Sequence, residues 1–313
     1  MRAEWEKRGL ILEPQKDVWW LASCAGACFA RTAAQENIVE IYVSGRDVKG
    51  RSHIGVVLFD LCEEKVTHIA PDPVLPLGEK GSFDENGTSY PYLASYQDTD
   101  YLYYTGWIQG VQVRWYNDLG LAVRKNGGEF RRLSRAPLPL RNDRDFIGIG
   151  SSCVLRHNER WLMWYTRFER WGGDLATDHE HYYNIKFASS EDGLAWRPHA
   201  DVCIDFADAA EYALAKPCVL LIEGRFVMWY SYRGMSYLPG LAVSEDGVHW
   251  RRHDKRVGIA PSAQGWDSAM LCYPFILERN EDFFMFYNGN GYGASGLGFA
   301  RISRRMLLRL LYD

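Results

Sequence analysis

The sequence has no block of like charge. Its 36 lysines and arginines and its 40 aspartates and glutamates are interspersed, and the formal net charge is −4. Binding to nucleic acid needs a concentrated basic face that neutralises phosphates, so no nucleic-acid partner is expected. A GxxxxGK(S/T) phosphate loop and a GxSxG nucleophile motif are also absent, which leaves P-loop chemistry and serine hydrolysis without support.

Cysteines in CxxC pairs are lacking as well. The seven cysteines are scattered, and the two closest, Cys24 and Cys28, are four residues apart. An odd number of cysteines with no small-spacing framework indicates reduced thiols in a cytoplasmic protein. A zinc site built from them is a weaker alternative, and we expect no metal and no cofactor.

No uncharged run is long enough to cross a membrane. The longest, VWWLASCAGACFA at Val18–Ala30, is shorter than the roughly 20 residues that a spanning helix requires. Charges of both signs precede it, Glu13 and Asp17 among them, which does not fit a signal peptide. We therefore expect a buried strand here, the innermost strand of the first structural unit.

One aromatic-rich strand recurs along the chain. It recurs at steps of roughly sixty residues, which indicates a supersecondary unit that is used repeatedly. An apolar strand with polar residues at its start precedes each later copy, and a further strand follows each copy. The five copies are EIYVSGRD (40–47), YLYYTGWI (101–108), LMWYTRFE (162–169), VMWYSYRG (227–234) and FMFYNGNG (284–291).

Hairpin turns add a fourth strand to the unit. SSEDGLAWRPH (189–199) and VSEDGVHWRRH (243–253) place Asp-Gly between two strands, and Asp-Gly favours a tight turn because both turn positions need positive φ. Four short strands per unit, repeated around a centre, predict an all-β fold, a five-bladed β-propeller. We expect a single domain over 1–313, with blades at about 15–78, 79–142, 143–206, 207–263 and 264–302 plus 4–12, and a tail at 303–313.

The two ends of the chain predict how the ring closes. EWEKRGLILEP (4–14) resembles HWRRHDKRVGIAP (249–261), a fourth-strand segment, but no three strands precede it. The last unit has three strands and lacks a fourth. Pairing the N-terminal strand with the last unit would complete that blade and remove two exposed sheet edges.

Residues at the strand ends differ from copy to copy, because each would meet a different part of one ligand in a central pocket. Acids at the start of the innermost strands are the predicted catalytic carboxylates: Asp84, Asp145, Glu211 and Asp267. The predicted substrate-binding residues are Arg46, Trp107, Arg167, His181, Lys216, Arg233, Trp266, Asn288 and Asn290.

Such residue types suit a carbohydrate or another glycosylated small molecule. Acids and amides bond to hydroxyls, and aromatic rings stack on a sugar ring. Two carboxyl groups suffice to cleave a glycosidic bond, and clustered acids separate each other's pKa values. The arginines also allow an anionic substrate. The structural alternative is that the acids are turn residues and the arginines simply pair with them.

Two further segments carry alternatives. In DHEHYY (178–183), His179 and His181 lie two apart and would share one face of a strand, as a metal pair does; a loop that contacts substrate is the favoured reading. The basic, leucine-rich tail RISRRMLLRLLYD (301–313) could touch a membrane as an amphipathic helix, but packing against the last unit is favoured.

The period, the S-x-DG-x-x-W hairpins and the GWDS…YP…FYNGNGYG…GLGFA ending resemble the five-bladed propellers of the glycoside hydrolase clans, which include family 43. The stretch 265–300 is similar to bacterial glycosidase-like proteins of polysaccharide gene neighbourhoods. These in turn are similar to the propeller portion of glucosamine inositolphosphorylceramide transferases. The resemblance covers nearly the whole chain and implies polysaccharide chemistry.

The same resemblance leaves two functions open. Family 43 enzymes carry a base aspartate at the start of blade 1, where WWLASCAGACFA has none and Asp17 only precedes it. By position, Asp84 or Asp145 matches the family's pKa-tuning aspartate, and Glu211 matches its acid. One hypothesis is an enzyme that cleaves or transfers a glycosyl unit with paired carboxylates. The other is a non-catalytic sugar- or glycolipid-binding module in polysaccharide or natural-product assembly.

Overall fold

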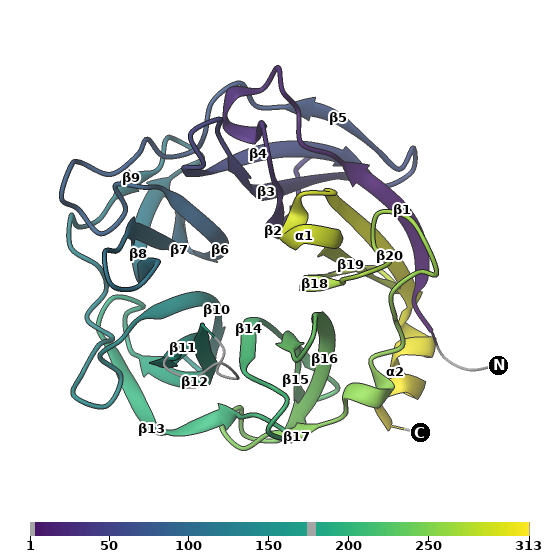
Figure 1. Ribbon diagram of the computed structural model, residues 1–313. Helices are drawn as coiled ribbons and strands as arrows, with labels where there is room; N and C mark the ends of the chain where they lie inside the picture. The colour runs from purple at the N-terminus through teal and green to yellow at the C-terminus, as the bar shows by residue number, and fades with distance from the viewer. Residues whose placement is uncertain (1–3, 174–179, 313) are drawn as a thin grey trace.

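The chain folds into sheets that are arranged around a common centre like the blades of a propeller (Figure 1). The computed structural model describes residues 4–173 and 180–312. Strands make up most of the secondary structure of these residues. The other elements are the short helix α1 (Asn290–Gly293), the C-terminal helix α2 (Arg304–Tyr312) and the 3-10 turns η1 (Trp19–Leu21) and η2 (Asp254–Arg256). The all-β class expected from the sequence is confirmed.

Three of the sheets have four strands each. Their strand orders are β2-β3-β4-β5, β6-β7-β8-β9 and β1-β20-β19-β18. The bounds are β1 Glu6–Leu12, β2 Ala25–Thr32, β3 Ile38–Arg46, β4 Ser52–Asp60, β5 Lys65–Ile69, β6 Thr88–Tyr96, β7 Thr99–Gln109, β8 Trp115–Lys125, β9 Arg131–Arg132, β18 Cys272–Arg279, β19 Asp282–Asn288 and β20 Leu297–Ser303.

The fourth sheet has eight strands. Its order is β10-β11-β12-β14-β15-β16-β17, with β13 paired to β12. A single parallel pair, Tyr183 with Ala213, joins β12 to β14; the other pairings in this sheet are antiparallel. The bounds are β10 Ile149–His157, β11 Arg160–Trp171, β12 His181–Ser190, β13 Trp196–Ile204, β14 Ala213–Ile222, β15 Arg225–Arg233, β16 Tyr237–Ser244 and β17 Arg251–Arg252.

The N-terminal strand closes the ring, as the sequence predicted. β1 pairs antiparallel with β20, from Glu6 opposite Arg301 to Leu12 opposite Leu297. Just before it, the buried indole of Trp5 donates a hydrogen bond to the Val257 carbonyl at 3.0 Å. Joining the two ends of the chain in one sheet satisfies backbone groups that an open edge would leave unpaired.

The repeated aromatic strand repeats because it forms the core of each sheet. Tyr104, Tyr165, Tyr230 and Tyr287 lie at equivalent places on β7, β11, β15 and β19, and each is at most 1% exposed. In the first sheet, Val43 occupies this place and is also buried. Every sheet packs between similar neighbours, so this position keeps a buried side chain, tyrosine in four of the repeats and valine in the first, whatever the pocket needs.

A bulge in each innermost strand shapes the centre of the ring. β2, β6, β10, β14 and β18 lie nearest the centre in Figure 1, and each loses register with its neighbour near its start. At these bulges Ala27, Tyr90, Lys216 and Tyr273 have positive φ. A bulge kinks its strand and redirects a side chain, so the residues around the centre turn away from the regular pleat.

The run Val18–Ala30 does not form one strand, which corrects the expectation from its hydrophobicity. Residues Trp19–Leu21 form η1, and β2 begins at Ala25. The reason is the Trp20 side chain, which is fully buried against Gly45 and Gly55, where a Cβ would lie 2.8 Å and 2.3 Å from its ring atoms. The turn lets this ring enter the core, and its indole donates to the Ala70 carbonyl at 2.9 Å.

The C-terminal tail packs as the favoured alternative predicted. Leu307 and Leu311 of α2 are buried in the hydrophobic core. Arg304, at the start of this helix, pairs with Glu223 at 2.9 Å and also with Glu278. Across the described residues, no helix is both long and apolar enough to cross a membrane.

Candidate functional site

A cavity of about 790 Å³ lies at the centre of the ring. Residues of all five innermost strands line it, among them Ala27 of β2, Tyr90 of β6 and Tyr273 of β18. Its walls come from the ends of the aromatic strands and from the loops that follow them. A volume of this size is typical of small-molecule sites.

Trp107 provides a flat face in this central pocket. It lies near the end of β7, and its indole donates to the Ser52 hydroxyl at 2.7 Å. The guanidinium of Arg46 lies 5.6 Å from the centre of the ring. Arg46 also donates to the Gly50 carbonyl at 3.0 Å. The hydrogen bond to Ser52 fixes the orientation of the Trp107 indole. The rest of the ring can contact a ligand in the pocket.

Tyrosines form a further part of the pocket wall. Tyr90 and Tyr273 meet edge to face at 5.3 Å, and burial raises the pKa of Tyr90 to about 12. Tyr183 and Tyr237 share a hydrogen bond between their hydroxyls at 2.7 Å. Burial also raises the pKa of Tyr183, Tyr237 and Tyr273, so all four phenols stay neutral at physiological pH. The three that line the pocket, Tyr90, Tyr183 and Tyr273, can donate to or accept from ligand hydroxyls.

Arg233, at the end of β15, lies inside a ring of tyrosines. Its guanidinium carbon lies 5.1 Å from the ring centre of Tyr212, 5.5 Å from that of Tyr237 and 5.5 Å from that of Tyr292. The Nε atom is buried and has no hydrogen-bond partner among the described residues. This site holds a positive charge against aromatic faces alone.

The pocket is poor in carboxylates. Three arginines line it, Arg46, Arg114 and Arg233, and Glu180 is the one carboxylate among the described lining residues. Glu180 is largely exposed and pairs with Arg114 at 3.1 Å. A chain with a net charge of −4 therefore presents a positively charged pocket, which favours anionic ligands.

His181 lies beside this pair at the start of β12. Its ring stacks on Tyr183 with centres 4.7 Å apart and packs against Trp115 at 5.7 Å. The predicted contact of His181 with the pocket agrees with its place in the lining. His179, its partner in the alternative of a metal pair, lies outside the described residues, and the described residues contain no cluster suited to a metal ion.

The four predicted catalytic acids do not line the pocket. Each is instead bonded to basic or tyrosine side chains. Asp84 is 1% exposed and accepts hydrogen bonds from Arg132 at 2.7 Å and from Tyr104 at 3.0 Å. Glu211 holds Arg252 with both oxygens, at 2.7 and 2.8 Å.

The other two acids are held in the same way. Asp145 accepts from Lys186 at 2.7 Å and from Arg167 at 2.9 Å. Burial opposes its ionisation, yet these two cations hold the pKa of Asp145 below its usual value. Asp267 binds Lys7 at 2.7 Å and the hydroxyl of Tyr287 at 3.1 Å. Lys7 lies on β1, so this pair also ties the closing strand to the last unit.

The remaining predicted binding residues divide between the pocket and the framework. Arg46, Trp107, His181 and Arg233 line the pocket, and Arg167, Lys216, Trp266, Asn288 and Asn290 do not. Trp266 stacks on Tyr287 at 5.2 Å. Asn288 accepts from the Ala27 amide at 2.8 Å and donates to the Tyr292 carbonyl at 3.0 Å. Asn290 accepts from the Ala269 amide at 2.7 Å.

Sequence reasoning missed several pocket residues. Tyr90 and Tyr273 carry a signal that could have found them, because each precedes a proline in an innermost strand (Ser89-Tyr90-Pro91 and Cys272-Tyr273-Pro274). Phe168 could have been found from strand alternation. Arg114, Trp115 and Tyr292 lie in or beside loops and at strand ends, where no sequence period marks them.

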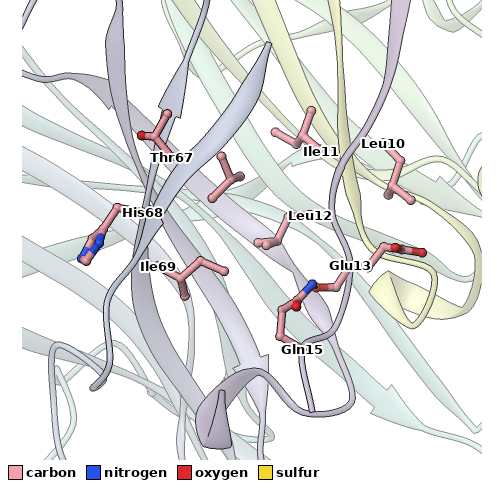
Figure 2. A pocket seen from close by; sticks show the side chains of 9 residues that line it. Leu10, Ile11, Leu12, Glu13, Gln15, Thr67, His68 and Ile69 are labelled. Atoms are coloured by element: carbon pink, nitrogen blue, oxygen red, sulfur yellow. The ribbon is translucent and has the colours of Figure 1, made fainter. Parts of the chain in front are cut away.

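A second, smaller cavity lies at the rim of the ring. It has a volume of about 370 Å³ and lies between β1 with its continuation and β5. Figure 2 shows Leu12 and Glu13 on one side of it and Thr67 and Ile69 on the other. Its lining has no aromatic ring stack and no arginine, so the central pocket is the better candidate for a specific ligand site.

The fold is that of glycoside hydrolase-like propellers. A solved structure described as "The GH130 family of mannoside phosphorylases contains glycoside hydrolases that target beta-1,2 mannosidic linkages in Candida mannan" superposes with a TM-score of 0.74, at 14% identity over 97% of this chain and 95% of that one. A thermostable family-43 glycoside hydrolase superposes with a TM-score of 0.67, at 14% identity over 88% of each chain. At such identities the likeness concerns the fold alone.

The sequence also has a relative of nearly the same length. It is 37% identical over 297 residues, 95% of this chain and 98% of the relative, to the protein MT1551 of Mycobacterium tuberculosis (strain CDC 1551 / Oshkosh), which is described as uncharacterized. The chain belongs to the same family as this mycobacterial protein. No family model matches the sequence.

Proposed function

We propose that this protein binds a carbohydrate in the central pocket, with the sugar ring stacked on Trp107 and its hydroxyls bonded to the pocket tyrosines. The indole is fixed by its hydrogen bond to Ser52, and Tyr90, Tyr183 and Tyr273 line the same cavity. The observation that carries the proposal is the lining itself, in which aromatic rings and donors surround a cavity of about 790 Å³.

Of the two hypotheses, the geometry supports a binding module better than a hydrolase. Cleavage by the usual glycosidase mechanism needs two carboxyl groups about 5–9.5 Å apart on either side of the bond. Within the described lining, the pocket offers Glu180 alone, and Arg114 pairs with it. The glycosidase-like fold favours the enzyme, and catalysis by Asp84, Asp145, Glu211 and Asp267 stays a prediction.

Replacing Trp107 tests the binding site. Trp107→Ala removes the stacking face and should weaken binding of a glycan about tenfold, or ~1.4 kcal/mol. Ligands would be found on a glycan array, and their affinities measured by isothermal titration calorimetry. The control is Trp19→Ala, which removes a half-exposed indole outside the pocket lining. Equal losses in both variants, or none in Trp107→Ala, would contradict the proposed site.

We propose further that the ring has five blades within one domain. The eight-stranded sheet repeats a four-strand order twice and is joined at one residue pair, which supports counting it as two blades. The cytoplasmic location remains part of the proposal and is supported by seven free cysteines. A role in polysaccharide assembly, and the likeness to glucosamine inositolphosphorylceramide transferases, stay predictions.

A further inference from the structure

Arg233 is a half-buried cation that lies among the aromatic rings of Tyr212, Tyr237 and Tyr292. Among the described residues, no carboxylate pairs with its guanidinium, and its Nε atom is buried without a hydrogen-bond partner. Burying a charged group without a partner is costly. Aromatic faces attract a cation and offset part of that cost, but they leave the donors of the guanidinium unused.

Other partly buried arginines of the same chain differ from Arg233 in this respect. Arg132 is bonded to Asp84, Arg167 to Asp145 and Arg252 to Glu211. The chain thus supplies a carboxylate where an arginine serves the framework. Arg233 lines the central pocket instead, and none of the described residues supplies a counter-charge to it.

The tyrosine rings around Arg233 are held in place by further contacts. Tyr292 has φ of 61°, a left-handed conformation that is rare outside glycine. Its carbonyl accepts a hydrogen bond from Asn288 at 3.0 Å, and its ring packs edge to face on Tyr237 at 6.0 Å. Tyr237 in turn is held by the hydroxyl of Tyr183. These contacts fix the rings and leave the guanidinium facing the pocket.

We propose that the carbohydrate bound in the central pocket carries an anionic group, a phosphate ester or a carboxylate, and that Arg233 binds this group. This inference rests on the proposed function and adds the class of ligand to it. A guanidinium presents two parallel N–H donors that match the oxygens of a phosphate or carboxylate. Arg46, beside Trp107, adds a second positive charge to the same pocket.

The test compares glucose with glucose 1-phosphate and glucuronate, and repeats the set for mannose and galactose. Calorimetry on the wild-type protein should show an anionic sugar binding on the order of 10- to 100-fold tighter than its neutral parent. The phosphate and uronate arms decide which group is preferred. In Arg233→Met that preference should fall to about one.

Arg225→Met is the matched control. Arg225 begins the same strand, also faces a tyrosine ring (Tyr312, 5.3 Å) and pairs with the exposed Glu245; its loss should leave the preference intact. Arg233→Lys keeps the charge without the planar guanidinium and should retain part of the preference for anionic sugars. An unchanged preference in Arg233→Met, or a wild-type protein that favours neutral sugars, would overturn the proposal.

Inorganic phosphate separates this inference from the proposed function. Phosphate should raise the thermal midpoint of the wild-type protein and of Trp107→Ala, but not that of Arg233→Met. Such a result with no sugar bound would remove the carbohydrate proposal and keep the anion site. Sugar binding that Trp107→Ala weakens, with no anionic preference, would keep the carbohydrate proposal and reject the anion site.

Discussion

Charged residues lie in two kinds of place in this molecule, and they are treated in opposite ways. Just before the innermost strands, the acids Asp84, Asp145 and Asp267 are buried and Glu211 is half-buried. Each is bonded to a cation, as Asp145 is to Lys186 and Arg167. In the central pocket, Arg233 is half-buried and meets three tyrosine rings, and no carboxylate of the described residues pairs with it. The first arrangement holds strands together, and the second leaves bonding capacity for a ligand.

The comparison indicates that the bonding partners of a charged residue, more than its residue type, distinguish a structural residue from a candidate ligand-binding residue. All four acids and the strand-end arginines are residue types that suit carbohydrate chemistry. A buried carboxylate that is bonded to two cations has its charge balanced within the fold, whereas a half-buried guanidinium without a carboxylate does not. The following changes test this distinction, in order of expected size.

The largest effect is expected for Asp145→Ala. The carboxylate is 1% exposed, and the Lys186 side chain beside it is 3% exposed. Removing the acid leaves a buried ammonium unpaired and should lower the free energy of unfolding by about 3–5 kcal/mol. Urea denaturation measures this change. The Arg233→Met protein serves as the opposite case, because losing an unpaired cation should not lower its stability.

A different result would put Asp145 among the catalytic residues. If Asp145→Ala unfolded at the wild-type urea concentration and yet lost turnover of a glycoside, its salt bridges would not be the main role of this acid. Asp145→Asn separates the two roles further, because it keeps the shape and loses the charge.

A smaller effect of opposite sign is expected for Lys216→Met. Lys216 is fully buried, and its amine has no hydrogen-bond partner among the described residues. Its nearest titratable neighbours are the thiols of Cys28, Cys153 and Cys218, whose own pKa values burial raises to about 12, 12 and 11. Replacing the amine with an apolar group of similar length should stabilise the fold by ~1–3 kcal/mol.

The pH dependence of this difference checks its cause. Burial lowers the pKa of Lys216 in the folded state, so the unfolded chain binds more protons, and wild-type stability rises with pH up to the ordinary lysine pKa of about 10.4. The gain in Lys216→Met should therefore shrink as the pH approaches that value. A variant less stable than wild type at pH 7 would show instead that the amine has a partner.

The smallest effect is expected at the surface. Arg225 and Glu245 pair at 2.9 Å, but their side chains are 45% and 74% exposed. Arg225→Met should change the free energy of unfolding by less than about 1 kcal/mol, because solvent screens the pair. A loss as large as that of Asp145→Ala, measured by the same urea denaturation, would break the comparison between buried and exposed pairs.

Much of the fold could be predicted from the sequence. The aromatic strands around Tyr104, Tyr165, Tyr230 and Tyr287 recur because each sheet packs between similar neighbours, and that constraint is local and periodic. The pairing of β1 with β20 was also predicted, because the N-terminal segment resembles a fourth strand. The turn at Trp19–Leu21 was not predicted. It depends on the space that Gly45 of β3 and Gly55 of β4 leave for the Trp20 ring.

The site was predicted less well, and Arg167 shows why. It was grouped with Arg46, Trp107 and Arg233, but it lies two residues after the strand tyrosine, whereas they lie three residues after theirs or after Val43. Successive side chains on a strand face opposite sides. Arg167 therefore faces Asp145, and the next residue, Phe168, lines the pocket.

The sequence by itself determined the repeated unit, the strand order within it and the closure of the ring, because these follow from periodic hydrophobic burial. Only the tertiary structure decided which charges are paired. Asp145 and Lys186 are 41 residues apart in the chain and meet at 2.7 Å, whereas Arg233 meets tyrosines from three separate segments. Such contacts depend on how strands and loops approach in space, which no local pattern encodes.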